Sequence, residues 1–262
     1  MLFDSHAHYD DERFEAEFEG GGHGAIEKAH SEGVGHIVNV GSNLKTSANS
    51  IALAEKYSFI YASVGIHPSD AQLIALEDVD KALYEVEKLT EHEKVRAVGE
   101  IGFDYHYDGT DRERQTYFFQ AQLEIARRRS LPVIIHSRDA AGDTFDMLRR
   151  NPLSFGVLHS YSGSAEMAVQ LTKMGWYISF SGPLTYKNAR GVKESAAAVP
   201  SDRILIETDC PYLPPTPHRG EINYSGYMKF TCVALAEIRK ITYAEAEKLT
   251  DDNAKRFYHV SD

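Results

Sequence analysis

Cysteine is scarce in this chain, since Cys210 and Cys232 are the only two among 262 residues. Two thiols cannot build the disulfide framework of a small secreted protein, so a reducing compartment is expected. Long apolar runs are missing as well, because none approaches the ~20 residues that a membrane helix needs. The first residues, 1–6, show neither the basic nor the apolar region of a secretory signal. These absences predict a cytoplasmic protein without a membrane partner.

Basic residues are also in short supply, with 28 Lys and Arg against 39 Asp and Glu and a formal net charge of −11. Such a charge argues against a protein that coats nucleic acid through a broad basic face. Stretches in which aromatic and basic residues alternate are absent too, which disfavours a DNA-binding module. An enzyme that acts on nucleic acid stays compatible with this charge, because a metal site supplies local positive charge.

No Pro/Gly/Ser-rich linker, long-period repeat or low-complexity tract divides the chain. Hydrophobic residues make up 42% of it, which is enough apolar mass for a large core. A single (β/α)8 barrel usually has about 250 residues, close to the length of this chain. We therefore predict one domain over residues 1–262.

Eight short apolar runs have the composition of β-strands. The gaps between them are long enough for a crossover helix with its loops, as parallel strands require. This alternation predicts an α/β fold, a TIM-like (β/α)8 barrel. The runs are 2–3, 36–40, 60–64, 95–98, 133–135, 157–158, 176–180 and 204–206.

Several segments between or after these runs carry helix or turn signals, such as helical spacing of apolar residues, capping residues and glycines. They are a helix over 115–128, a helix over 164–174 with Ser164 as its N-cap, a helix opened by a capping box of Thr242 and Glu245, a final segment over 252–258, and a flexible lid or turn at 20–22.

Six residues of metal-binding type directly follow five of the runs. The carboxyl ends of the strands of an α/β barrel point into one mouth, so residues far apart in sequence meet there around an ion. The first two histidines are two positions apart on an extended segment, and their side chains face the same side of it. The six are His6, His8, Glu100, His136, His159 and Asp209.

Each of these residues also has a structural explanation when taken alone. A lone His-x-His pair and a single core histidine are common without a metal, and Glu100 could be a buried carboxylate paired with an arginine. Together, four imidazoles and two carboxylates suit Zn²⁺, Mn²⁺ or Fe²⁺ better than Mg²⁺, which is possible with added waters. We predict two divalent ions (Zn²⁺, Mn²⁺ or Mg²⁺), with Asp209 on the first, His136 and His159 on the second, and Glu100 as a bridging and catalytic carboxylate.

Six blocks of the sequence carry the more specific motifs, namely Asp4–His8, Gly65–Pro68, Gly99–Asp104, Pro132–Arg138, His159–Gly163 and Glu207–Leu213. As a set they resemble the signature blocks of the TatD family, metal-dependent deoxyribonucleases within the amidohydrolase-type barrels. The resemblance extends from the first residues to about Phe257. It implies a TIM-like barrel, one or two divalent cations and hydrolysis of DNA phosphodiesters, and it matches at all six ligand positions.

One loop departs from the pattern of this family. After Arg219 and Gly220 the family often has a second basic residue followed by Asn-Glu-Pro, whereas this chain continues with Glu221–Ser225 and keeps only the Asn. We expect this loop to face the barrel mouth, so the departure bears mainly on the range of substrates.

The expected reaction is attack of a water molecule, activated by the two metal ions, on a phosphodiester. Asp209 is expected to orient or deprotonate that water. Arg138 is expected to grip a flanking phosphate through its planar guanidinium, and a salt bridge with Asp139 or Asp143 is the equal alternative. For His67, which has no obvious metal to bind, we expect a hydrogen bond to a substrate phosphate.

Two other functions fit parts of this pattern. A small-molecule hydrolase of the same barrel type would act on an amide, a lactone or an ester, including an ester on tRNA. Such enzymes often carry a carbamylated Lys on the fourth strand, where this chain has Glu100. Purely structural ions are disfavoured, because structural sites are closed and usually bind one ion through four ligands.

The favoured substrate is DNA, single-stranded or at its ends, and no obligate protein partner is evident.

Overall fold

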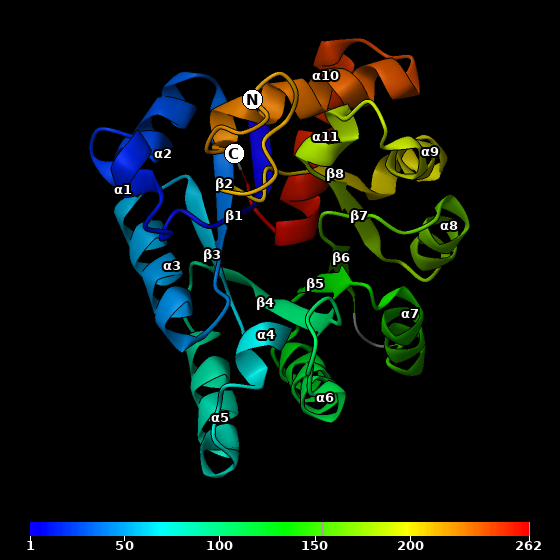
Figure 1. Cartoon of the computed structure of the whole chain (residues 1–262). Coiled ribbons are helices and arrows are strands. Elements are labelled where there is room, and N and C mark those ends of the chain that lie inside the picture. The colour runs from blue at the N-terminus through cyan, green and yellow to red at the C-terminus, as the bar shows by residue number, and fades with distance from the viewer. Residues whose placement is uncertain (153–154, 262) are drawn as a thin grey trace. The chain divides into compact units, whose positions relative to one another are not determined.

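The protein is described by a computed structural model, which covers residues 1–152 and 155–261. Contacts within the chain divide it into two compact units, Met1–Asn39 with His159–Asp262, and Val40–Leu158. Figure 1 shows that parallel strands and helices alternate along the chain in both units. The single domain expected over residues 1–262 stays a prediction.

The first unit contains the strands β1 (Leu2–Ala7), β2 (Val34–Val40, which ends at the unit boundary), β7 (Tyr177–Phe180) and β8 (Ile204–Ile206). β1 pairs with β2 and β7 pairs with β8, both in parallel. A parallel bridge between Ala7 and Cys210 brings the end of β1 beside the segment that follows β8. The strands of this unit therefore run in the order β7, β8, β1, β2.

The helices of this unit pack around its strands (Figure 1). The last of them contacts both β1 and β8, and its Tyr258 hydroxyl donates to the carbonyl of Ser5 at 2.8 Å. The bounds are α1 (Phe14–Glu17), α2 (Gly21–Ser31), α8 (Ala165–Lys173), η2 (Gly182–Thr185), α9 (Arg190–Ala198), η3 (Ser201–Arg203), η4 (Ser225–Tyr227), α10 (Met228–Arg239) and α11 (Tyr243–Tyr258).

The second unit contains β3 (Ile60–Val64), β4 (Val95–Asp104), β5 (Val133–Arg138) and β6 (Gly156–Leu158), which pair in parallel in this order. The residues of β3 and β4 are almost all buried, which is the burial expected for parallel strands covered by helices. Its helices are α3 (Leu44–Lys56), α4 (Pro68–Ala71), η1 (Leu76–Asp78), α5 (Val79–Leu89), α6 (Arg112–Arg129) and α7 (Ala141–Arg150).

The eight strands of the described residues lie where the apolar runs predict them, but several are longer than predicted. β3 and β8 have the predicted bounds, whereas β4 continues to Asp104 and β5 to Arg138. The reason is that backbone pairing continues beyond the apolar side chains, as far as the pair Asp104–Arg138. Glu100 and His136 therefore lie within strands and not directly after them, and His6 likewise lies within β1 (Leu2–Ala7), which corrects that expectation for all three.

Among the helices, the predicted caps are confirmed. Ser164 accepts a hydrogen bond from the amide of Met167 at the start of α8, and Thr242 and Glu245 form the reciprocal capping box of α11. The predicted separate segment over 252–258 is wrong, because α11 runs without a break to Tyr258. Of the two alternatives for the glycine run, the structure shows the turn, in which Gly20 (φ +81°) is the N-cap of α2 and Gly21 is its first residue. No helix of the described chain has the length and apolar character to cross a membrane.

Candidate metal centre

In the first unit, two histidines and one aspartate bring three ligand atoms together. His6 lies in β1 and His8 directly after it, so alternation along the strand places both imidazoles on one side. Their Nε2 atoms are 3.0 Å apart, and they lie 3.7 Å and 3.5 Å from Oδ1 of Asp209. Three atoms with these separations can all lie about 2 Å from one ion, which is the bond length of Zn²⁺ to His nitrogen and carboxylate oxygen.

The backbone holds Asp209 in this position. Its amide donates to the carbonyl of His6 at 2.9 Å, and the amide of His8 donates to the carbonyl of Cys210 at 2.8 Å. Asp209 adopts the left-handed conformation (φ +57°), which Asp tolerates better than most residues. Burial raises the pKa of Asp209, but the hydrogen bond of His8 and the charges of His159 and His6 outweigh it, so the pKa lies below its usual value. The carboxylate is therefore ionised at neutral pH and able to bind a cation.

His159 follows β6 in sequence and joins this group through a carboxylate that the sequence analysis missed. Oε1 of Glu207 lies 3.3 Å from Nδ1 of His159 and accepts a hydrogen bond of 2.6 Å from the amide of Ser160. The ring of His159 stacks on that of His6 at 4.1 Å between centroids. A carboxylate at Nδ1 orients the imidazole so that Nε2 would be the metal ligand. Glu207 is therefore a positioning residue, and a carboxylate directly after the apolar run 204–206 was the signal for it.

The same carboxylate provides a test of whether the site suits a cation. Glu207 is 1% exposed, and within the described chain its Oε2 atom has no hydrogen-bond partner. His6, His159 and Glu207 also place one potential ligand atom each within 4.8 Å of one another. An excess of buried negative charge beside imidazoles is costly without a compensating cation. The donor set of this unit therefore fits a divalent metal.

A second buried carboxylate, Asp4, holds the ligand-bearing segments together. It is 0% exposed and accepts hydrogen bonds from the amide (2.9 Å) and hydroxyl (2.5 Å) of Thr208, from the hydroxyl of Ser225 (2.6 Å) and from the amide of His6 (3.3 Å). Burial raises the pKa of Asp4 to about 6, and these hydrogen bonds oppose the rise. We call these four residues the Asp4 cluster; it connects β1, the end of β8 and η4.

We expect Thr208→Val to lower the free energy of unfolding by about 1–3 kcal/mol, the cost of leaving a buried polar group short of a partner. Valine keeps the shape of the side chain but removes the hydroxyl that donates to Asp4. Urea unfolding of the metal-free protein measures this change separately from metal binding. Thr250→Val is the matched control, because Thr250 is 2% exposed and its hydroxyl donates only to carbonyls of its own helix. Equal losses in the two variants would contradict the role of the Asp4 cluster.

In the second unit, His136 in β5 lies between two carboxylates of β4. Its Nδ1 is 2.8 Å from Oε1 of Glu100, and its Nε2 is 3.3 Å from Oδ2 of Asp104. Burial raises the pKa of Asp104, but the hydrogen bonds of His136 and of the His106 amide outweigh it, so the pKa lies below its usual value. This arrangement fits an ion bound by Nδ1 and Glu100 while Asp104 orients the ring from the other nitrogen.

A glycine in β4 makes this arrangement possible. Gly102 is paired with His136 and has φ +144°, a conformation that side chains rarely adopt. A Cβ atom at this position would lie 2.0 Å from the carbonyl oxygen of His136. The close approach of β4 to β5, which brings Glu100 and Asp104 to the imidazole, therefore requires glycine here.

His67 also belongs to the second unit, where it caps the short helix α4. Its Nδ1 accepts a hydrogen bond of 3.1 Å from the amide of Ser69, and its Nε2 lies 3.8 Å from Oε1 of Glu100. Because Nδ1 is an acceptor, the neutral imidazole carries its proton on Nε2. In this tautomer His67 can donate a hydrogen bond from Nε2. Its ligand atom also lies within 4.8 Å of those of Asp104 and His136, a group that could hold an ion. The predicted hydrogen bond of His67 to a substrate phosphate stays a prediction.

The two expected partners of Arg138 are engaged elsewhere. Asp139 lies 3.0 Å from Nδ1 of His106, and Asp143 accepts a hydrogen bond of 2.9 Å from the hydroxyl of Tyr105. The guanidinium of Arg138 is exposed at the end of β5, 5.7 Å from the ring centroid of Tyr107, and forms no salt bridge within 4.0 Å to a described residue. The salt-bridge alternative for Arg138 is therefore not what the structure contains.

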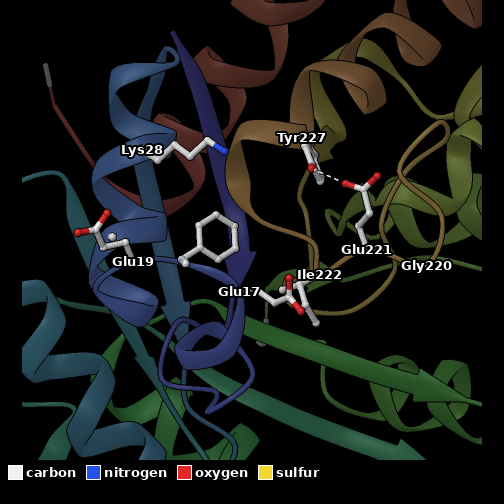
Figure 2. A pocket seen from close by; sticks show the side chains of 9 residues that line it. Glu17, Glu19, Lys28, Gly220, Glu221, Ile222 and Tyr227 are labelled. Atoms are coloured by element: carbon white, nitrogen blue, oxygen red, sulfur yellow. Dashed lines mark hydrogen bonds between the residues drawn. The ribbon is translucent and has the colours of Figure 1, made fainter.

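The loop that departs from the family pattern lines a separate hollow of the first unit (Figure 2). Its volume is about 640 Å³, and in Figure 2 Lys28 of α2 and the hydrogen-bonded pair Glu221–Tyr227 lie on opposite sides of it. Three carboxylates and one ammonium group line it, so it does not attract an anionic substrate. The lining residues are Glu17, Phe18, Glu19, Gly24, Lys28, Gly220, Glu221, Ile222 and Tyr227.

Comparisons with known proteins agree with this chemistry. The sequence model of the family described as TatD related DNase matches residues 3–259. YabD of Bacillus subtilis (strain 168), named an uncharacterized metal-dependent hydrolase, is 41% identical over 100% of both chains. YcfH of Escherichia coli (strain K12), which carries the same description, is 34% identical over 99% of this chain and 96% of its own length.

A solved structure supplies the fold. The crystal structure of YjjV, a TatD homologue from Escherichia coli K12, matches with a TM-score of 0.90 at 30% identity, over 99% of this chain and 98% of that one. The predicted α/β fold, a TIM-like (β/α)8 barrel, is confirmed by this match. The chain belongs to the TatD family of metal-dependent hydrolases.

Proposed function

We propose that the protein is a divalent-metal-dependent deoxyribonuclease that hydrolyses phosphodiester bonds of single-stranded DNA or DNA ends. The observation that supports this most directly is the triangle of His6, His8 and Asp209, whose ligand atoms are 3.0–3.7 Å apart. Six protein ligands shared between two ions would leave coordination positions for water and substrate, as catalytic sites require. The description of the matching family model, TatD related DNase, supports the choice of DNA as the substrate.

The proposed centre holds two ions. The sequence predicts that all six ligands meet at one barrel mouth, and the proposal of a shared centre rests on that prediction. We assign His6, His8 and Asp209 to the first ion, His136 and His159 to the second, and Glu100 to both. When bound, two such ions polarise the phosphoryl oxygen and lower the pKa of a coordinated water. A mixed nitrogen and oxygen donor set favours Zn²⁺ or Mn²⁺ and admits Mg²⁺ with added waters.

The protein side chains then supply positioning and proton transfer. Asp209, which is ionised because its pKa lies below its usual value, orients the attacking water and is the carboxylate placed to accept its proton. His67 donates from Nε2 to a phosphate oxygen, since Nδ1 is engaged with the amide of Ser69. Arg138, exposed and without a described salt bridge, binds the phosphate next to the scissile one through its planar guanidinium.

The charge of the chain bears on the substrate. With a formal net charge of −11, attraction of an anionic phosphodiester depends on the metal ions and on the few cations beside them. Hydrolysis of DNA should therefore slow as salt increases, whereas hydrolysis of a neutral amide, lactone or ester should not.

We also propose that the protein works in the cytoplasm, where the free thiols of Cys210 and Cys232 stay reduced.

The test is cleavage of end-labelled single-stranded DNA by metal-stripped protein that is resupplied with Mg²⁺, Mn²⁺ or Zn²⁺. We expect metal-dependent cleavage that is lost in Glu100→Ala and kept in Glu124→Ala, a control on the exposed face of α6. The ladder of products separates exonuclease from endonuclease action. Absence of cleavage with every metal, although two ions are bound per chain, would rule out the nuclease and direct the search to ester, amide and lactone substrates.

A further inference from the structure

An aromatic side chain lies beside the first group of ligands and has no role in the proposed reaction. Tyr212 follows Asp209 by three positions and is 47% exposed, although most aromatic residues near these segments are buried. Its ring stands edge-on to the imidazole of His8, with 6.2 Å between centroids and 85° between planes. A half-exposed aromatic ring at this distance from a metal ligand lies within reach of the groups that flank a bound phosphate.

The backbone of Tyr212 is tied to the ligand-bearing segment. Its amide donates to the carbonyl of Asp209 at 2.9 Å. The side-chain amide of Asn223, which is 0% exposed, donates to the carbonyls of both Tyr212 (2.7 Å) and Thr208 (2.9 Å). The backbone that carries the ring is thus held in a constant relation to Asp209, as a binding surface on a rigid support should be.

Arg13 supports the ring from one face. Its guanidinium carbon lies 4.1 Å from the ring centroid of Tyr212. Nε and Nη2 of Arg13 donate to the two carboxylate oxygens of Asp11 at 2.8 Å and 2.7 Å, which fixes the plane of the guanidinium. Because Asp11 neutralises this charge, Arg13 acts here by stacking and not as a phosphate clamp.

We propose that Tyr212 forms a stacking site for the nucleobase next to the scissile phosphodiester, an inference that rests on the proposed deoxyribonuclease function. Stacking of bases on aromatic side chains accepts every base, since each has a π-face. A base within a duplex already has both faces covered by its neighbours. The site therefore selects an unpaired base, in a single strand or at a frayed end, without selecting sequence.

The test uses short oligonucleotides with one natural phosphodiester in an otherwise phosphorothioate backbone. Tyr212→Ala should raise KM by about 5- to 150-fold, which corresponds to the 1–3 kcal/mol per base of aromatic stacking, with kcat nearly unchanged. Two further substrates each carry an abasic residue, one on the 5′ side and one on the 3′ side of the natural linkage. One of the two should give the same KM for Tyr212→Ala and for the wild type. Tyr212→Trp should keep the wild-type KM. Tyr84→Ala, which alters an exposed tyrosine (65%) of α5, is the matched control.

Fluorescence gives a second measurement that does not depend on hydrolysis. The chain has one Trp, Trp176, which is 1% exposed, so an added tryptophan in Tyr212→Trp reports on its own surroundings. In metal-loaded Tyr212→Trp, an oligonucleotide with phosphorothioate at every linkage, which is not cleaved, should quench this emission, and its abasic counterpart should not. Oligonucleotide that is bound, as shown by its fluorescence anisotropy, but leaves the emission unchanged would overturn the inference.

The outcomes separate this inference from the proposed function. Suppose that wild-type protein cleaves the oligonucleotide and that Tyr212→Ala has the wild-type KM. The stacking inference is then wrong, and the proposed nuclease function is unaffected. The same conclusion follows if Tyr212→Ala raises KM equally for the ordinary substrate and for the abasic substrates of both sides. If wild-type protein cleaves no DNA with any metal, the proposed function fails and the stacking site fails with it.

Discussion

Asp209→Asn is expected to lower kcat for DNA hydrolysis by about 10²- to 10⁴-fold, the usual contribution of a general base. Asparagine has the shape of aspartate and keeps one oxygen toward His6 and His8, but it accepts no proton from the attacking water and carries no charge to balance the ions. The left-handed backbone of Asp209 (φ +57°) suits asparagine as well as aspartate, so the fold should be retained. Single-turnover cleavage of labelled single-stranded DNA, with the metal content of each variant measured, gives the effect.

Asp202→Asn is the control for this substitution, because the side chain of Asp202 is 60% exposed on η3 and, among the described residues, forms a salt bridge with Arg203 alone. It should cleave DNA at the wild-type rate. An Asp209→Asn variant that holds the wild-type amount of metal and keeps the wild-type kcat would show that another group accepts the proton. In that case Asp209 would be a metal ligand alone.

The positions of the strands along the chain could be predicted from the sequence, because a short apolar run between polar segments is enough to indicate a strand. The runs 60–64 and 204–206 coincide with β3 and β8. The ends of β4 and β5 could not be predicted in this way, since their pairing extends through polar side chains as far as Asp104 and Arg138. Backbone hydrogen bonds do not depend on apolar side chains. Hydrophobic patterns therefore do not predict the strand ends that carry Glu100 and His136.

The continuity of the helix α11 could not be predicted from the sequence either. The sequence predicts a helix that begins at Thr242 and a separate final segment over 252–258, whereas α11 is continuous from Tyr243 to Tyr258. In the structure Asn253 is 1% exposed and its side-chain amide donates to the carbonyls of Ser201 (2.7 Å) and Ile204 (2.9 Å). A buried asparagine that satisfies the orphan carbonyls of neighbouring segments is compatible with a continuous helix. Only the tertiary structure reveals these partners.

The positioning residues of the candidate site were the hardest to predict. Glu207 acts through the amide of Ser160 and the ring of His159, which lie 47 and 48 positions away in sequence. Arg13 acts through the ring of Tyr212. Metal ligands can be recognised by residue type and by their place after a strand, whereas residues that orient ligands are defined by contacts between distant segments.

Metal binding should raise the thermal stability of the protein through both groups of ligands. At a free metal concentration of about 1,000 times Kd, each ion adds about 4 kcal/mol to the free energy of unfolding. For a chain of this size one kcal/mol corresponds to roughly 2–4 °C, so each ion should raise Tm by roughly 8–16 °C. Calorimetry of the stripped protein with and without Zn²⁺ or Mn²⁺, together with elemental analysis of bound metal, measures the shift.

Substitution of one ligand in each group shows how much of the metal-induced rise in Tm comes from each ion. His6→Ala and His136→Ala should each bind one ion fewer and show about half of the metal-induced rise in Tm, because the energy of mass action is separate for each ion. The comparison uses the rise and not Tm itself, since loss of a buried imidazole also changes the stability of the metal-free protein. His92→Ala, which removes a partly exposed histidine paired with Glu55, should keep the full rise. If both ligand variants kept the wild-type rise and two bound ions, His6 and His136 would not be metal ligands, and the proposed two-ion assignment would be wrong.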